Sequence, residues 1–292
     1  MTDTPSGSLH RGLVGDKSVR FLAVEARALA EHTRHAHGLG PHAAKAAGEA
    51  TIAALLMSAW IKGEERITLQ LQSEDPRFAY MGEVDAEGRH RARLTPGTLR
   101  MRKDGTVQGL MMAIKADAKK EIYRGITPLE GQTIEHALVG HLSTSDQVDI
   151  ILRIQVVLKE DGSVRTAGGL LVERLPEDPS QPSISQEEFH NTYAAIPHQD
   201  IADLHTALAF GKIANLPVEL LENRVLSWHC ACSHDKVEGM LMTLGQAELQ
   251  SILDDLGQAE VTCHYCNTQR VFDSDALKRL LANYDQAEAP EA

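Results

Sequence analysis

The first 229 residues of this 292-residue chain contain no cysteine. Aromatic residues account for only 4% of the chain, so a folded core has to be built mainly from aliphatic side chains. No stretch approaches the length of about 18 uninterrupted apolar residues that a membrane-spanning helix needs, and the N-terminal segment MTDTPSGSLHRGL lacks the apolar centre of a secretory signal. We therefore expect a cytoplasmic protein that does not cross a membrane.

Basic residues are outnumbered by acidic ones, 29 to 41, and the formal net charge of the chain is −12 at pH 7. Proteins that bind the phosphates of nucleic acids carry clustered lysine and arginine instead. The composition therefore predicts no nucleic-acid partner. The hydrophobic share of 42% and the charged share of 24% are ordinary for a globular protein, and the length suffices for one large domain or two modest ones.

Residues 10–178 carry the pattern of an α+β domain with mainly antiparallel strands. Ile67, Leu69 and Leu71 alternate with polar residues, as in a strand with one buried face. Two apolar segments flank Asp161-Gly162, a pair that favours a tight hairpin turn. Further strands are expected at 19–26 and between 78 and 126, with a turn at Asp104-Gly105, and helices at 26–38, 41–63 and 132–142; the segment before residue 19 is expected to be irregular.

The composition changes at 176–188, where PEDPSQPSISQEE contains three prolines and three serines. Such a segment is typical of a hinge or linker. Short amphipathic helices are predicted beyond it, at 200–209 and in PVELLEN at 217–223. We therefore expect a helical linker over 179–225, followed by a small C-terminal module over 226–285.

The only four cysteines of the chain lie in that module, as Cys230 and Cys232 in a C-x-C pair and Cys263 and Cys266 in a C-x-x-C pair. Two close pairs separated by 30 residues suit a tetrahedral zinc ion, which binds thiolates at about 2.3 Å. The 30-residue spacer is long enough for two short helices. Because four thiolates complete the tetrahedron, we expect none of the neighbouring histidines to be a ligand; these are His229, His234 and His264.

The C-x-C pair suggests that the metal site responds to oxidants. One intervening residue leaves the two sulfurs able to meet in a strained, labile disulfide if the metal departs. Zinc binding contributes about 10–16 kcal/mol in small metal-folded peptides, so its loss should unfold a module of this size. Unfolding would expose the apolar faces that contain Leu241, Met242, Leu244, Leu249, Ile252, Leu253 and Leu256.

Two other functions are compatible with a pair of cysteine doublets. A constitutive zinc ribbon could bind protein without any switching, whereas 12 acidic and five basic residues from Glu222 onward disfavour nucleic acid. A thiol–disulfide oxidoreductase places its C-x-x-C at a helix N-terminus, but here the strand-like QRVF follows Cys266. We see no catalytic constellation in the sequence and expect no enzyme.

The chain resembles the family of the 33-kDa heat-shock protein, a redox-regulated molecular chaperone. The resemblance runs from about residue 10 to residue 281 and is most specific in CACS, the 30-residue spacer and CHYC. The segments ERITLQLQ at 65–72, STSDQ at 143–147 and TAGGLLVERLP at 166–176 are also similar to family segments.

The resemblance implies an ATP-independent holdase that is inactive while it is reduced and holds one Zn²⁺ per chain. It implies that oxidation converts the thiolates to two disulfides, Cys230–Cys232 and Cys263–Cys266, and releases the zinc. The C-terminal module and the linker would then unfold, and the exposed apolar surface would bind unfolded client proteins. The family also implies a homodimer in the oxidised state.

Overall fold

The computed structural model describes residues 4–15, 17–74, 77–95, 106–146, 149–176, 183–197, 201, 204, 208 and 211–287. Three expected features lie wholly or mostly outside these residues: the turn at Asp104-Gly105, the proline-rich centre of the linker at 177–182, and the helix at 200–209. Residue 147, the last residue of the STSDQ segment, also lies outside them.

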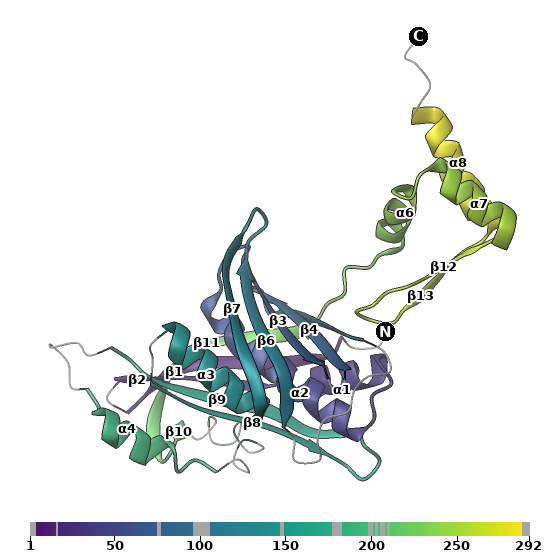
Figure 1. The fold of residues 1–292 in the computed structure, drawn as a ribbon. Coiled ribbons are helices and arrows are strands. Elements are labelled where there is room, and N and C mark those ends of the chain that lie inside the picture. The colour runs from purple at the N-terminus through teal and green to yellow at the C-terminus, as the bar shows by residue number, and fades with distance from the viewer. Residues whose placement is uncertain are drawn as a thin grey trace. The chain divides into compact units, whose positions relative to one another are not determined.

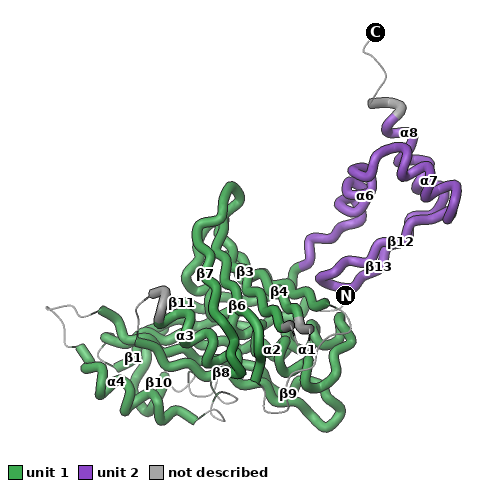
Figure 2. Tube along the Cα trace, in the orientation of Figure 1, with its two compact units in different colours: residues 1–229 green, residues 230–292 purple. Residues whose placement is uncertain are grey.

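The chain divides into two compact units, Met1–His229 and Cys230–Ala292 (Figure 2). Each unit has its own buried core. Among the described residues, no helix combines the length and the apolar character that crossing a membrane requires.

The first unit has an α+β fold built on one large sheet (Figure 1). The described strands follow one another across it in the order β7-β6-β3-β4-β5-β11-β1-β2-β9-β8, and β10 pairs with β11. The pairs are antiparallel except for β11 and β5, which are parallel. The strands are β1 (Ser6–Val14), β2 (Val19–Glu25), β3 (Arg66–Glu74), β4 (Arg77–Asp85), β5 (Arg89–Leu94), β6 (Val107–Ala116), β7 (Glu121–Gln132), β8 (Ile150–Leu158), β9 (Val164–Arg174), β10 (Lys212–Ile213) and β11 (Leu216–Trp228).

The predicted α+β class and its mainly antiparallel sheet are therefore confirmed. The alternating segment at 66–74 is β3, with Ile67, Leu69 and Leu71 buried. The expected hairpin is β8–β9, which turns at Asp161-Gly162 with Gly162 at a φ of +79°.

Helices cover the sheet and close the core of the first unit. The helix α2 (Pro41–Met57) is buried on almost every side because it contacts α1 (Arg27–Ala36), α3 (Ile134–Asp146) and the strands beneath it. A Cβ at Gly169 would lie 2.5 Å from a methyl of Ile52, so the absence of a side chain there lets α2 lie close to β9. A 3₁₀ turn at Ser58–Trp60 follows α2, and α4 (Gln186–Tyr193) lies farther along the chain.

Two expectations about the first unit are wrong. The N-terminal segment is not irregular, because Ser6–Val14 forms β1 between β2 and β11. The segment 217–223 is not helical, because it belongs to β11, which pairs with β1 along the whole of that strand. Its Leu and Glu residues favour a helix, but pairing with a strand some 200 residues earlier overrides so weak a preference.

The second unit contains α6 (His234–Met242), α7 (Gln246–Leu256), the hairpin β12 (Ala259–Thr262) and β13 (Gln269–Phe272), and α8 (Ser274–Ala287). The two helices expected in the cysteine spacer are α6 and α7. Of the seven apolar residues on the faces that unfolding was expected to expose, Leu244 and Leu256 are already 50% and 71% exposed in the folded unit. The core consists of the buried residues Val237, Leu241, Leu249, Ala259, Phe272, Ala276, Leu277, Leu280 and Leu281.

Candidate metal centre

Cys230 and Cys232 lie in the short segment between β11 and α6. Ser233 ends this segment as the N-cap of α6, and its Oγ accepts a hydrogen bond from the backbone N–H of Lys236. The backbone N–H of Ser233 also donates to the carbonyl of Ala231 at 2.9 Å, which tightens the chain around Cys232. The helix start therefore holds the C-x-C pair in a compact turn.

Cys263 and Cys266 lie in the loop of the β12–β13 hairpin. The backbone N–H of Cys263 donates to the carbonyl of Thr268 at 3.0 Å, and the N–H of Asn267 donates to the carbonyl of Cys263 at 2.8 Å. Asn267 adopts a φ of +56°, a left-handed conformation that asparagine tolerates better than most residues. These bonds close the C-x-x-C loop, and both of its thiols lie within 4.8 Å of the thiols of the C-x-C pair.

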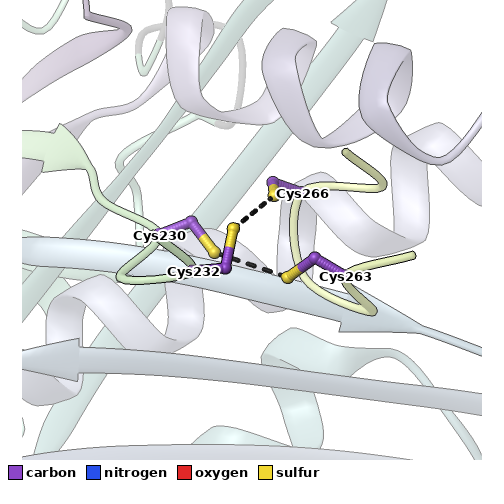
Figure 3. A group of neighbouring side chains, drawn as sticks. All are labelled: Cys230, Cys232, Cys263 and Cys266. Atoms are coloured by element: carbon purple, nitrogen blue, oxygen red, sulfur yellow. Dashed lines mark hydrogen bonds between the residues drawn. The ribbon is translucent and has the colours of Figure 1, made fainter. Parts of the chain in front are cut away.

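The four sulfurs meet although they come from two segments 30 residues apart (Figure 3). Cys230 Sγ lies 3.6 Å from Cys263 Sγ, and Cys232 Sγ lies 3.3 Å from Cys266 Sγ. All four sulfurs lie within 4.8 Å of one another and are partly exposed. Four thiolates around zinc at about 2.3 Å would lie about 3.8 Å apart. The cysteines are therefore positioned to hold a metal ion, and the thiolate set suits zinc.

The thiols of this cluster differ in acidity. Burial raises the pKa of Cys230 and that of Cys232. Burial also acts to raise the pKa of Cys266, but its hydrogen bonds with the side chain and the backbone of Thr268 and with the neighbouring thiols lower that pKa to about 7. Cys266 Sγ lies 3.2 Å from Thr268 Oγ1. A bound divalent cation favours the thiolate form of every ligand and overrides these differences.

The neighbouring histidines are not part of the sulfur cluster. The backbone N–H of His229 donates to the carbonyl of His90, within the first unit. The ring of His234 packs against Phe272 with ring centroids 4.7 Å apart, and its Nδ1 faces Glu238 at 3.5 Å. His234, Asp235 and Glu238 form a separate, largely exposed group at the N-terminus of α6, where the helix dipole disfavours a cation.

Two residues beside the cysteines were not predicted from the sequence. Thr268 contacts Cys266, and Arg270 donates from Nη2 to the backbone carbonyl of Cys232. Thr268 lies two residues after the C-x-x-C pair, which is a weak signal for such a contact. Arg270 gave no signal, because its partner lies 38 residues earlier in the chain.

Comparison with known proteins agrees with this geometry. The family described as Hsp33 protein matches residues 7–273. The chain belongs to the Hsp33 family. A relative named 33 kDa chaperonin from Citrifermentans bemidjiense is 28% identical, with 96% of this chain and 98% of the relative covered. A second one from Bacillus subtilis is 24% identical, with 93% and 97% covered.

A solved structure has the same fold as this chain. The crystal structure of the 33 kDa chaperonin from Thermotoga maritima has a TM-score of 0.80 and 24% identity, and it covers 96% of this chain and 99% of the other. Hsp33 proteins are chaperones rather than enzymes, so the family assigns this chain a chaperone function. The resemblance stated from the cysteine motif is therefore confirmed.

Proposed function

We propose that this chain is a redox-regulated, ATP-independent holdase. In the reduced state, Cys230, Cys232, Cys263 and Cys266 bind one Zn²⁺ and keep the protein inactive. Oxidation of the four cysteines releases the zinc, and the protein then binds unfolding proteins and prevents their aggregation. Its clients are unfolded or partly unfolded polypeptides, it acts in the cytoplasm, and its oxidised form is a homodimer.

The meeting of four thiols from two segments is the observation that supports this proposal. With sulfurs 3.3–3.6 Å apart across the two segments, a metal ion would connect the start of α6 to the β12–β13 loop. The connected unit is small, and its buried core contains nine of the described residues. A core of that size contributes little stability, so a zinc ion adding about 10–16 kcal/mol would decide whether the unit is folded.

Oxidation removes two electrons for each disulfide formed. With hypochlorous acid, two thiolates, one HOCl and one proton give a disulfide, chloride and water, so two equivalents convert the whole cluster. We propose the pairs Cys230–Cys232 and Cys263–Cys266, although the nearest sulfurs in the folded unit pair across the two segments. Once the unit unfolds, loops of one or two residues close far more readily than loops of about 30 residues.

The proposed switch is joined to a linker and a chaperone core. We propose three functional parts: a chaperone core over 10–178, a linker over 179–225, and the switch module over 226–285. In the structure, β11 (216–228) belongs to the sheet of the first unit, so the folded switch unit begins at Cys230. The linker leads directly into the switch module, because β11 ends at Trp228, two residues before Cys230.

The test follows zinc and holdase activity together. Hypochlorous acid is added to the purified, reduced, zinc-loaded chain while released zinc is measured with a chromophoric chelator and aggregation of a thermally unfolding client by light scattering. We expect about one zinc per chain to leave as aggregation becomes suppressed. Peptide mapping of the oxidised chain should find both disulfides between neighbours in sequence.

A Cys263→Ser variant tests the switch directly, because it cannot form the second disulfide. We expect it to bind zinc more weakly and to show an altered gain of holdase activity on addition of oxidant. Zinc that stays bound, or that leaves without any gain in holdase activity, would contradict the switch and favour a constitutive zinc ribbon that binds protein.

A further inference from the structure

The hairpin β12–β13 has one face toward the core of the second unit and one toward solvent. Ala259 pairs with Phe272 and Val261 pairs with Arg270, so these four residues share the inward face. Ala259 and Phe272 are buried, and Val261 packs against the same core. By alternation an apolar side chain is expected at residue 270, yet the chain has an arginine there. A cation on the inward face of a small apolar hairpin needs a specific reason.

The contacts of Arg270 supply that reason. Its Nη2 donates to the backbone carbonyl of Cys232, the second cysteine of the C-x-C pair. Its Nε is buried and has no hydrogen-bond partner among the described residues. A guanidinium stays charged at every physiological pH, so a partly buried cation lies directly against the turn that carries two of the four sulfurs.

The charge of the metal centre makes this position significant. One Zn²⁺ with four thiolates has a net charge of −2. From Cys230 to the C-terminus the sequence holds 11 acidic residues and only four basic ones, so the surrounding unit opposes an anionic centre. The other three basic residues are Lys236, Lys278 and Arg279, and Lys278 is 63% exposed on α8, where it pairs with Asp275.

We propose that Arg270 is a positioning and charge-compensating residue of the metal centre. Its hydrogen bond holds the carbonyl of Cys232 and therefore the shape of the C-x-C turn. Its charge stabilises the four-thiolate state that binds zinc. This inference rests on the proposed function, because it requires the four cysteines to bind zinc as thiolates.

Zinc affinity tests this role without reference to chaperone activity. The reduced full-length chain is titrated with zinc against a chromophoric chelator, for the wild type, Arg270→Met, Arg270→Lys and Lys278→Met. Loss of a residue that supports a metal ligand typically costs 10–100-fold in metal affinity, and we expect a loss of about that size for Arg270→Met. Arg270→Lys keeps the charge and should stay within about threefold of wild type.

Lys278→Met is the matched control, because it removes the same charge from the same unit at an exposed site. We expect it to bind zinc within about twofold of wild type. We also expect zinc to leave Arg270→Met faster than it leaves Lys278→Met after the same dose of hypochlorous acid. Circular dichroism of the zinc-loaded variants checks that each unit is folded, and Arg270→Lys decides the question if Arg270→Met does not fold.

Two results would overturn the inference. The first is an Arg270→Met affinity equal to that of Lys278→Met. The second is an Arg270→Lys affinity as weak as that of Arg270→Met in a folded unit, since the charge would then have no role. If the wild type itself binds no zinc, the proposed function fails as well, whereas a wild type that releases one zinc on oxidation leaves it standing.

Discussion

At the scale of single residues, two ionisable groups of the first unit lie in surroundings that oppose their charge. His90 is fully buried, with Nδ1 3.1 Å from the carbonyl of Glu83 and its ring edge-on to Trp228. Burial lowers the pKa of His90 from 6.5 to about 4, although the Glu83 carbonyl opposes this. On α2, burial raises the pKa of Glu49 from 4.5 to about 7, although Lys45 opposes this.

These two pKa changes have opposite effects on stability. The contribution of His90 to the free energy of unfolding is present above pH 6.5 and is lost as the pH falls toward 4. The reason is that, as the pH falls, the histidine takes up its proton in the unfolded chain before it does so in the folded chain. The contribution of Glu49 to the free energy of unfolding is present below pH 4.5 and is lost as the pH rises through 7. The reason is that the carboxyl keeps its proton to a higher pH in the folded chain than in the unfolded chain. Each change corresponds to about 3 kcal/mol over its whole range.

Between pH 5 and pH 7 the change in unfolding free energy due to His90 nearly cancels the change due to Glu49. Single substitutions separate the two effects. Relative to wild type, Glu49→Gln should gain about 2 kcal/mol of unfolding free energy on going from pH 5 to pH 7, and His90→Phe should lose about 2 kcal/mol. Urea unfolding followed by tryptophan fluorescence measures this, since both tryptophans, Trp60 and Trp228, lie in the first unit. Variants that both keep the wild-type pH dependence would show that neither group titrates as described.

At the scale of elements, β11 determines how the sheet is closed. It pairs with β1 along the whole length of β1 and with β5 only at Ser227 and Trp228. Side chains strengthen its place: Arg224 donates to the carbonyl of Ser58 at 3.1 Å, and Glu222 pairs with Arg11 at 2.8 Å. This one strand therefore joins two groups of strands into a single sheet.

Two leucines of β11 provide a matched test of this placement. Leu226 is completely buried, whereas Leu221 is 55% exposed. Leu226→Ala should lower the unfolding free energy by about 2–5 kcal/mol because it leaves a cavity in the core. Leu221→Ala should change it by no more than about 0.5 kcal/mol. Equal effects in urea unfolding would mean that this segment does not lie in the sheet in solution.

At the scale of the whole molecule, the two units differ in what stabilises them. The unit Met1–His229 has a broad aliphatic core around α2 and the sheet, which is sufficient for a stable fold without a metal. The unit Cys230–Ala292 has a small core and a four-cysteine cluster. Their stabilities are therefore expected to respond differently to the removal of metal.

Chelation of zinc from the reduced chain should unfold the second unit and leave the first one folded. The helical signal in circular dichroism should fall by the share that α6, α7 and α8 contribute. Limited proteolysis should cut the chain after residue 229 while the first unit remains intact. Tryptophan fluorescence should not change, because both tryptophans lie in the first unit. A single cooperative loss of both units on chelation would contradict the independence of the two cores.

The amino-acid sequence alone determined the features that depend on neighbours along the chain. The alternation at 67–71, the turn at Asp161-Gly162 and the spacing of the four cysteines predicted the α+β class, the hairpin β8–β9 and the four cysteines that the fold brings together as candidate metal ligands. Periodicity and short spacing constrain strands, helices and close pairs of ligands because these form within a few residues.

Only the tertiary structure decided the features that join distant segments. Ser6–Val14 looked irregular and 217–223 looked helical because the long pairing between them joins segments some 200 residues apart. The contact of Arg270 with the Cys232 turn and the approach of the two cysteine pairs also arise from how the second unit folds. Local preferences of a few tenths of a kcal/mol per residue yield to burial and strand pairing, which no short window of sequence reveals.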